Sequence, residues 1–349
     1  MTTALAIVAA VLAVSLLIVI HEAGHFLAAR RFGMGVERFS IGFGPVLLAF
    51  RRGETEFAVS ALPLGGYVKI SGMAPGEAKE NADPKLFANQ PAWRRFLVIL
   101  AGPAMNYAAA ILVAWGLLAT LGLRALDPAP RVGALQPGMP AEAAGLKPGD
   151  RIAAVDGKPI ATWAELVAEL QRRPARPAVL DVVRGEGERA ERISVPITPR
   201  DEGGVGRVGV RQHTILLRTG PGQALVQAFR GTNENAAAQL RAFGSLFQRK
   251  QRVEGPIGIA RELVQGARDG AEPFLGTVWT ISVVLAILNL LPFPALDGGR
   301  LVFLGYEIVT RRRVNERVEH VFHMIGFFVL VGLILAVTVF GDLPRLLGR

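Results

Sequence analysis

Four long apolar runs limit what this chain can fold into. Each lacks Asp, Glu, Lys and Arg over about 20 residues or more, which is the length that a helix rising 1.5 Å per residue needs to cross a bilayer core of about 30 Å. They predict four transmembrane helices and a polytopic α-helical membrane protein. The runs cover residues 2–21, 96–123, 273–296 and 321–341.

The composition favours a membrane protein over a soluble enzyme. Hydrophobic residues make up 51% of the 349 residues and charged residues 19%, against about 25% charged in an average soluble domain. The absence of cysteine excludes a disulfide scaffold, a thiol nucleophile and any Cys-ligated metal. The net charge is +10, but the basic residues are scattered. We therefore predict no nucleic-acid partner.

The first apolar run has two interpretations, a cleaved signal peptide or a spanning helix. It has no basic segment before the apolar residues and no small-residue cleavage site before the first charges. These absences favour a spanning helix.

Residues 124–272 return to a soluble composition and predict a folded domain outside the bilayer. Short apolar stretches alternate with Gly-Asp turns over residues 131–157, and a helix is expected at 162–171 from apolar residues three and four apart. This pattern resembles one bacterial PDZ domain over residues 128–200. A generic small β domain is the alternative. PDZ domains bind an extended chain end as an added strand.

Residues 201–272 are expected to connect that domain to the membrane. Within them, residues 221–252 read as a basic amphipathic helix that suits a membrane surface, although a plain connecting helix is also possible. The predicted divisions are 1–127 with the first two spans, 128–200, 201–272, and 273–349 with the last two spans. The apolar positions of the amphipathic segment are Ala224, Leu225, Ala228, Phe229, Leu240, Phe243, Leu246 and Phe247.

Lys and Arg near the span ends predict the orientation. The 28–95 connection carries ten of them and the 297–320 connection five, whereas the tail after Gly341 carries two and the first four residues none. The protein is expected in the cytoplasmic (inner) membrane. Since basic connections remain in the cytoplasm, both termini and the PDZ-like insert are expected on the extracytoplasmic side.

The first apolar helix ends in a metal-binding motif, His21-Glu22-Ala23-Gly24-His25. Two His at i and i+4 share one helical face, so both imidazoles can reach one Zn²⁺, and Glu22 can take a proton from water at the metal. Ionisable groups at membrane depth mark functional sites. The alternative is a pair of helix-end histidines that contact headgroups. The site is expected inside the bilayer, near its cytoplasmic face.

Asp297 is the predicted third metal ligand. Pro292 and Pro294 must break the third apolar helix, and Gly298 and Gly299 permit a sharp turn beside the aspartate. The ends of the first and third spans share a leaflet, because the chain crosses outward and back between them. A kinked helix that ends in a capping Asp is the alternative.

His320 and His323 lie three residues apart where the fourth span begins. A second zinc pair is conceivable, but the nearby sequence offers only Glu319 as a carboxylate. Interfacial histidines are the preferred interpretation.

These motifs together resemble the site-2 protease family, the bacterial intramembrane zinc metalloproteases of the RseP and RasP type. The resemblance covers nearly the whole chain. It departs from some relatives in having one PDZ domain where they carry two in tandem. The matching segments are residues 21–25, 42–45, 65–70, 101–106, 255–260 and 289–299.

The resemblance implies roles for particular residues. His21, His25 and Asp297 would bind zinc, and Glu22 would act as general base and acid. A membrane-reentrant β-loop and a strand edge would receive the unwound substrate, which Asn289 and Pro292 would help to hold. The loop and edge residues are Gly42, Gly44, Gly66, Tyr67, Val68 and Lys69.

The resemblance also implies regulated intramembrane proteolysis. The expected substrates are single-pass membrane proteins, such as anti-sigma factors already cut by an upstream site-1-type protease, or remnant signal peptides. The PDZ domain would exclude bulky ectodomains or sense a new chain end. The alternative function is a membrane-anchored PDZ adaptor with a vestigial metal site.

Overall fold

The computed structural model describes residues 2–73, 83–185, 187, 190–218, 220–245 and 255–343. The chain forms two compact units. The helical unit comprises residues 1–121 and 220–349, and the insert unit comprises residues 122–219.

Four described helices of the helical unit are long and apolar enough to cross a membrane: Thr3–Arg31, Ala92–Leu121, Ala271–Leu290 and Arg317–Asp342. They correspond to the four predicted runs. At most 33% of the most apolar window of each is buried, so most of these residues are at least partly exposed. The elements of this unit are α1 (Thr3–Arg31), β1 (Val36–Arg52), β2 (Thr55–Ile70), η1 (Phe87–Asn89), α2 (Ala92–Leu121), α5 (Pro221–Ser245), α6 (Pro256–Asp269), α7 (Ala271–Leu290), α8 (Asp297–Thr310), α9 (Glu316–Val337) and η3 (Thr338–Asp342).

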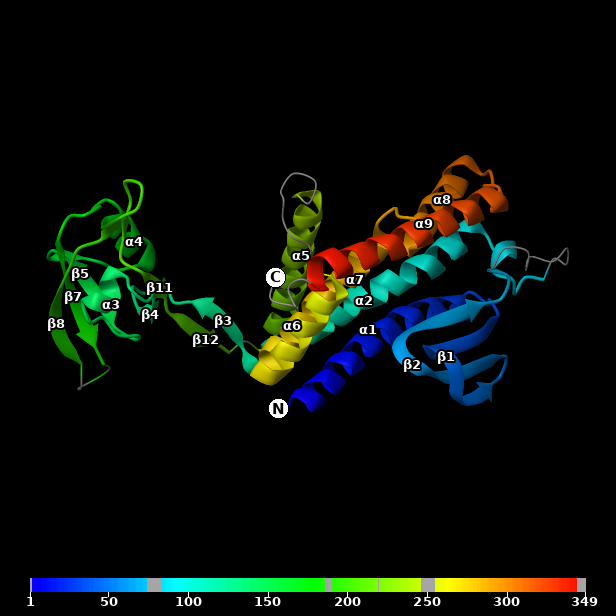
Figure 1. Ribbon diagram of the computed structural model, residues 1–349, viewed down its shortest axis with the longest axis horizontal. Coiled ribbons are helices and arrows are strands. Elements are labelled where there is room, and N and C mark those ends of the chain that lie inside the picture. The colour runs from blue at the N-terminus through cyan, green and yellow to red at the C-terminus, as the bar shows by residue number, and fades with distance from the viewer. Residues whose placement is uncertain are drawn as a thin grey trace. The chain divides into compact units, whose positions relative to one another are not determined.

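Helix α2 packs against both α1 and α7 (Figure 1). The α1–α2 contact is close at Gly24, where an added β-carbon would lie 2.2 Å from the carbonyl oxygen of Ala101. Small residues allow the backbones of membrane helices to approach in this way. The predicted zinc motif therefore faces the α2 backbone directly.

The predicted proline break after the third span is present. Helix α7 ends at Leu290, and Leu291 is extended with ψ 140°, as a residue before proline prefers. Ala295 then takes a positive φ of 70°, and α8 begins at Asp297. The break is what brings this aspartate to a helix start.

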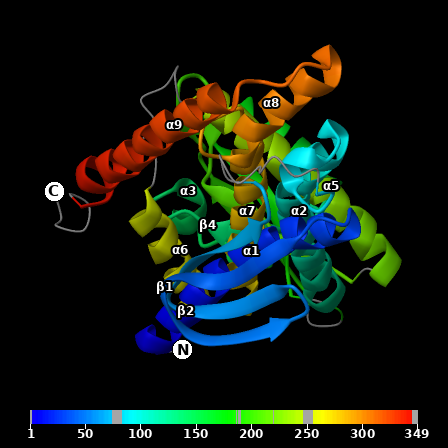
Figure 2. The same ribbon diagram turned by 90° about the vertical axis from the view of Figure 1, so that its right-hand side faces the viewer.

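Strands β1 and β2 form a curled antiparallel pair beside the C-terminal half of α1 (Figure 2). Residues 38–41 lie opposite both 56–59 and 66–69, so the 66–70 stretch forms one border of the sheet. Its outer side pairs with no other strand in the described part of the chain. Gly42, with φ 86°, allows the bend, because a β-carbon there would lie 2.6 Å from the Leu62 carbonyl oxygen.

Helix α5 packs on α2 and α7. It buries Ala224 and Ala228, and Trp279 Nε1 donates a hydrogen bond to Thr232 Oγ1 at 3.1 Å. Leu225 and Phe229 stay exposed, so the membrane-surface interpretation of residues 221–252 stays a prediction. Leu246 and Phe247, which belong to that pattern, lie outside the described residues.

The insert unit contains a four-stranded sheet in the order β6-β5-β7-β8. Three further strand pairs, β4 with β11, β3 with β12 and β9 with β10, accompany it among the described residues. Its elements are β3 (Leu123–Leu126), β4 (Val132–Leu135), α3 (Pro140–Ala143), β5 (Arg151–Val155), β6 (Lys158–Pro159), α4 (Trp163–Gln171), β7 (Ala178–Arg184), β8 (Glu191–Ile197), β9 (Arg200–Asp201), β10 (Gly206–Arg207), β11 (Val210–Gln212) and β12 (Thr214–Leu217).

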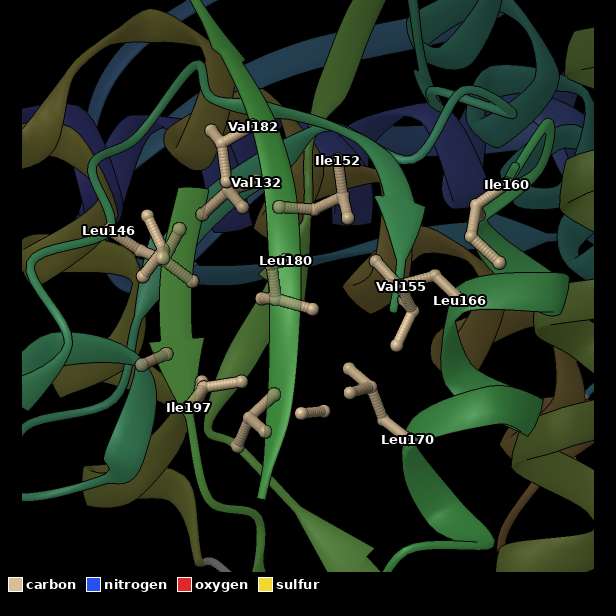
Figure 3. Packing of buried hydrophobic residues seen from close by; sticks show 14 residues of the cluster. Val132, Leu146, Ile152, Val155, Ile160, Leu166, Leu170, Leu180, Val182 and Ile197 are labelled. Carbon is tan, nitrogen blue, oxygen red and sulfur yellow. The ribbon is translucent and has the colours of Figure 1, made fainter. Parts of the chain in front are cut away.

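One apolar core holds the insert unit together. Leu180 and Val182 on β7 alternate toward the core, as a half-buried strand requires. Leu166 and Leu170 on α4 face them across the interior (Figure 3). The helix predicted at 162–171 is present as α4, and Thr162 caps it by accepting the Glu165 backbone N–H at 3.2 Å.

The insert unit is wider than the predicted 128–200 domain, because strands far apart in the sequence pair with each other. Strand β12 pairs with β3, and β11 pairs with β4. Residues 201–217, which were predicted to lie in the connector, therefore belong to the compact unit.

An ion pair between the buried Asp150 and the half-buried Arg184 predicts an acid-dependent contribution to the stability of the insert unit. Burial raises the pKa of Asp150, but hydrogen bonds from the Arg184 guanidinium and the Lys147 backbone N–H lower it by more. The pKa of Asp150 in the folded protein is therefore below that of an ordinary aspartate. Arg184 Nε and Nη2 lie 2.9 and 2.8 Å from the carboxylate. A depressed folded pKa stabilises the fold above the unfolded value of about 3.9, and the stabilisation is lost as pH falls through the folded value.

We expect Asp150→Asn to lower the opening free energy of β5 and β7 by about 1–3 kcal/mol at pH 7, since Arg184 loses a charged partner. Hydrogen exchange measured on the full chain checks this. The difference from wild type should shrink below about pH 4, and a difference independent of pH would contradict the assignment.

Candidate metal centre

Helix α1 presents His21 and His25 one turn apart toward α2, with their Nε2 atoms 3.2 Å from each other. Both residues are buried. An added β-carbon at Gly102 of α2 would lie 2.3 Å from His25 Nε2 and 2.9 Å from His21 Cε1. Gly102 thus makes the space that the two imidazoles occupy.

Asp297, the first residue of α8, joins the two histidines. Its Oδ2 atom lies 3.1 Å from His21 Nε2 and 3.3 Å from His25 Nε2. This oxygen is buried, and none of the described residues donates a hydrogen bond of suitable geometry to it. The break after α7 therefore delivers a carboxylate to the imidazoles of α1.

The three atoms fit a zinc ion. A triangle with edges of 3.1, 3.2 and 3.3 Å has its corners about 1.9 Å from its centre, close to the roughly 2.0–2.2 Å of zinc bonds to His nitrogen and carboxylate oxygen. Two imidazoles and one carboxylate are also the donors of known catalytic zinc sites, which keep a fourth position open. The residues present suit the predicted metal.

Groups on α2 contact the outer nitrogen of each imidazole. His25 Nδ1 donates to the Val98 carbonyl oxygen at 2.8 Å. Asn106 Nδ2 lies 3.4 Å from His21 Nδ1. An acceptor at Nδ1 fixes the orientation of an imidazole and leaves its Nε2 atom for a metal, and His25 has such an acceptor in the Val98 carbonyl oxygen.

Glu22 faces β2. Its Oε2 accepts the Val68 backbone N–H at 3.0 Å. A cavity of about 470 Å³ lies beside it and reaches from the histidines to the sheet border and the start of α8. The lining residues are His21, Glu22, His25, Tyr67, Val68, Lys69, Ile70, Met73, Ala295, Leu296, Asp297 and Arg300.

His323 of α9 contacts the loop that precedes Asp297. The Ala295 backbone N–H donates to His323 Nδ1 at 3.0 Å. Among the described residues, His21, His25 and Asp297 form the one group of three or more metal-ligating side chains close together. The second zinc pair considered for His320 and His323 thus has no third ligand in the described part of the chain.

The residues expected to hold substrate fall into two groups. Tyr67, Val68 and Lys69 line the cavity. Gly66 is adjacent to it, since its added β-carbon would lie 3.7 Å from Glu22 Cγ. The described lining does not include the remaining four, which are Gly42, Gly44, Asn289 and Pro292.

Sequence reasoning assigned no role to several residues that the structure brings to the site. Gly102 and Asn106 belong to the 101–106 segment, which matched the family pattern. That match was the available signal, but the residues next to the histidines depend on how α2 packs against α1. Arg300 and Met73 line the cavity without any such signal.

Apolar membrane-crossing helices around a His-Glu-x-x-His motif and an aspartate define a class, the membrane-embedded metalloproteases. The model of peptidase family M50 matches residues 9–333. The chain belongs to peptidase family M50, and it is a multi-pass membrane metalloprotease.

Curated relatives with zinc metalloprotease names match over nearly their full length. One from Clostridium perfringens is 32% identical, covering 95% of this chain and 97% of the relative. One from Brucella suis is 32% identical, covering 94% and 92%. One from Nostoc is 33% identical, covering 94% and 93%.

Among solved structures, the PDZ domain of an SdrC-like protein from Listeria monocytogenes aligns with 26% of this chain and 93% of that chain. The sequence identity is 19% and the TM-score 0.21.

Gly102→Ala should weaken zinc binding by about tenfold or more, because the new methyl group displaces both imidazoles and misplaced ligands typically cost 10–100-fold in affinity. Competition with a chromophoric chelator measures this on purified protein. Gly116→Ala on the same helix is the matched control, since a β-carbon there meets nothing within 4 Å. Equal affinities of the two variants would show that the imidazoles do not depend on Gly102.

Proposed function

We propose that this metalloprotease uses zinc to hydrolyse peptide bonds within the transmembrane segments of single-pass membrane proteins. The observation that carries the proposal is the meeting of His21, His25 and Asp297 beside Glu22. His21, Glu22 and His25 belong to a helix apolar enough to span the bilayer. An ordinary soluble substrate would not reach such a position.

A bound zinc ion would supply Lewis acidity to the scissile carbonyl and to the attacking water. His21, His25 and Asp297 would hold the metal, and the Val98 carbonyl oxygen keeps the His25 ring with its Nε2 atom toward it. Glu22 is the general base and acid: its carboxylate accepts a proton from water and returns it to the leaving amine. The Val68 N–H keeps Glu22 Oε2 at the cavity.

The border of β2 is the proposed substrate platform. A helical substrate hides its carbonyl groups in i to i−4 hydrogen bonds and must become extended before attack. Residues 66–69 form the border of the sheet next to Glu22, and their outer side pairs with no other strand in the described part of the chain, so an extended segment can add there. Asn289 and Pro292 are proposed to hold substrate as well, at positions outside the described cavity lining.

The outer part of the β1–β2 pair is the proposed reentrant loop. Leu47, Leu48 and Phe50 are 64–72% exposed, which suits contact with lipid or with an apolar substrate. Gly42 and Gly44 have φ values of 86° and 85° and permit the bend from which this part extends.

We propose a PDZ domain within the insert unit, over residues 128–200 as predicted. A groove of about 300 Å³ between α4 and residues 206–210 supports a binding site and extends the proposed domain beyond the predicted end at residue 200; its lining includes Met139, Leu166 and Leu170. Such a groove suits an extended chain end. The domain would exclude bulky ectodomains or recognise an end produced by an upstream site-1-type protease. Anti-sigma factors and remnant signal peptides are the proposed substrates.

The proposed location is the cytoplasmic (inner) membrane, with the termini and the insert unit outside and the metal centre near the cytoplasmic face. The excess of Lys and Arg in residues 28–95 and 297–320 supports this orientation.

Glu22→Gln should abolish cleavage of a model transmembrane segment while zinc content stays near that of wild type, because only the proton acceptor is lost.

Asp297→Ala should lower zinc content, because one of three ligands is removed. Metal analysis and reconstituted cleavage assays measure both effects. Cleavage by Glu22→Gln at the wild-type rate would refute the mechanism, and zinc-free wild-type protein would favour the adaptor function.

The absence of cysteine allows the orientation to be measured with single-Cys variants. In right-side-out vesicles, a membrane-impermeant maleimide should label Glu191→Cys in the insert unit and spare Val309→Cys near the end of α8. Both positions are exposed. The unmodified chain is the unlabelled control. The reverse pattern would invert the proposed topology.

A further inference from the structure

The 101–106 segment of α2 contains a polar residue to which the proposed mechanism assigns only a contact. Gly102 makes room for both imidazoles, but Asn106 is 1% exposed in the middle of a membrane-crossing helix. A buried carboxamide at this depth is costly unless its polar atoms have partners.

Two contacts hold Asn106 beside His21. Ser282 Oγ on α7 donates to the Asn106 backbone carbonyl oxygen at 2.8 Å, which ties the backbone of α2 at this point to α7. The side-chain Nδ2 lies 3.4 Å from His21 Nδ1. The other side-chain atom, Oδ1, is buried and has no hydrogen-bond partner among the described residues.

A histidine that ligates a metal through Nε2 carries its remaining proton on Nδ1 and needs an acceptor there. His25 has the Val98 carbonyl oxygen. His21 has the carboxamide of Asn106 within hydrogen-bond distance. A half-turn about the Cβ–Cγ bond exchanges the two ends of this group, so the unpaired Oδ1 can face His21 Nδ1.

We infer that Asn106 is the positioning residue of His21: its Oδ1 accepts the Nδ1 proton of His21 and holds the imidazole with Nε2 toward the zinc. The inference rests on the proposed zinc site. Asn106 itself contacts neither substrate nor metal. Its carboxamide can donate or accept, and it therefore partners His21 with or without a metal.

Three variants of the full chain separate positioning from helix packing. Asn106→Leu keeps the approximate shape and removes both polar atoms. Asn106→Asp restores an acceptor at nearly the same place. Ser282→Ala is the matched control, since it removes a buried hydrogen bond to the same residue but leaves the side chain at His21 untouched.

Zinc affinity is measured by chelator competition on purified protein, and metal geometry by the visible spectrum of cobalt-substituted protein. We expect Asn106→Leu to bind zinc about 10–100-fold more weakly, as loss of such a partner typically does, and to change the cobalt spectrum. Asn106→Asp should recover affinity to within a few-fold of wild type. Ser282→Ala should keep both affinity and spectrum.

Wild-type affinity and spectrum in Asn106→Leu would overturn the inference and leave the zinc site intact. An equal loss in Ser282→Ala would overturn it too, by showing that helix packing alone is responsible. Failure of Asn106→Asp to recover affinity would exclude the acceptor role even if Asn106→Leu did not fold. A wild-type protein without zinc would instead defeat the proposed function.

Discussion

The meeting of two imidazole nitrogens and one carboxylate oxygen is the constraint on which the rest of the structure depends. The donors come from α1 and α8, on opposite sides of the insert in the chain. They can meet because α1 and α2 approach closely at Gly24 and Gly102 and because the break after α7 brings Asp297 to the start of α8. Polar groups buried among apolar helices destabilise the fold unless they are paired. The close contact between the helices and the metal-ligating cluster therefore depend on each other.

Around this cluster, the irregular backbone lies next to a cavity. The residues between α7 and α8 include Ala295 with a positive φ, and its N–H is satisfied by His323. On the other side, the Val68 N–H at the β2 border is satisfied by Glu22. Backbone outside regular helices is tolerated at membrane depth where it is buried in protein or lines a watery cavity, and hydrolysis needs such a cavity.

The insert unit has its own core and its own ion pair between the buried Asp150 and the half-buried Arg184. Its core residues come from β4, α3, β5, α4, β7, β8 and connecting segments, and they form one cluster. The two activities proposed for the chain, recognition of a chain end and peptide hydrolysis, thus belong to separately packed parts.

Local pattern was enough for the features that depend on neighbouring residues. It determined the four apolar helices, the shared face of His21 and His25, the proline break before Asp297 and the capped helix α4. Only the tertiary structure decided that β11 and β12 pair with β4 and β3, or that Gly102 and Asn106 adjoin the imidazoles. The same holds for Gly42 and Asn289, which lie outside the described cavity lining. Helix period and proline geometry act within a few residues, whereas these contacts join segments far apart in the chain and exist only once the helices and strands have packed.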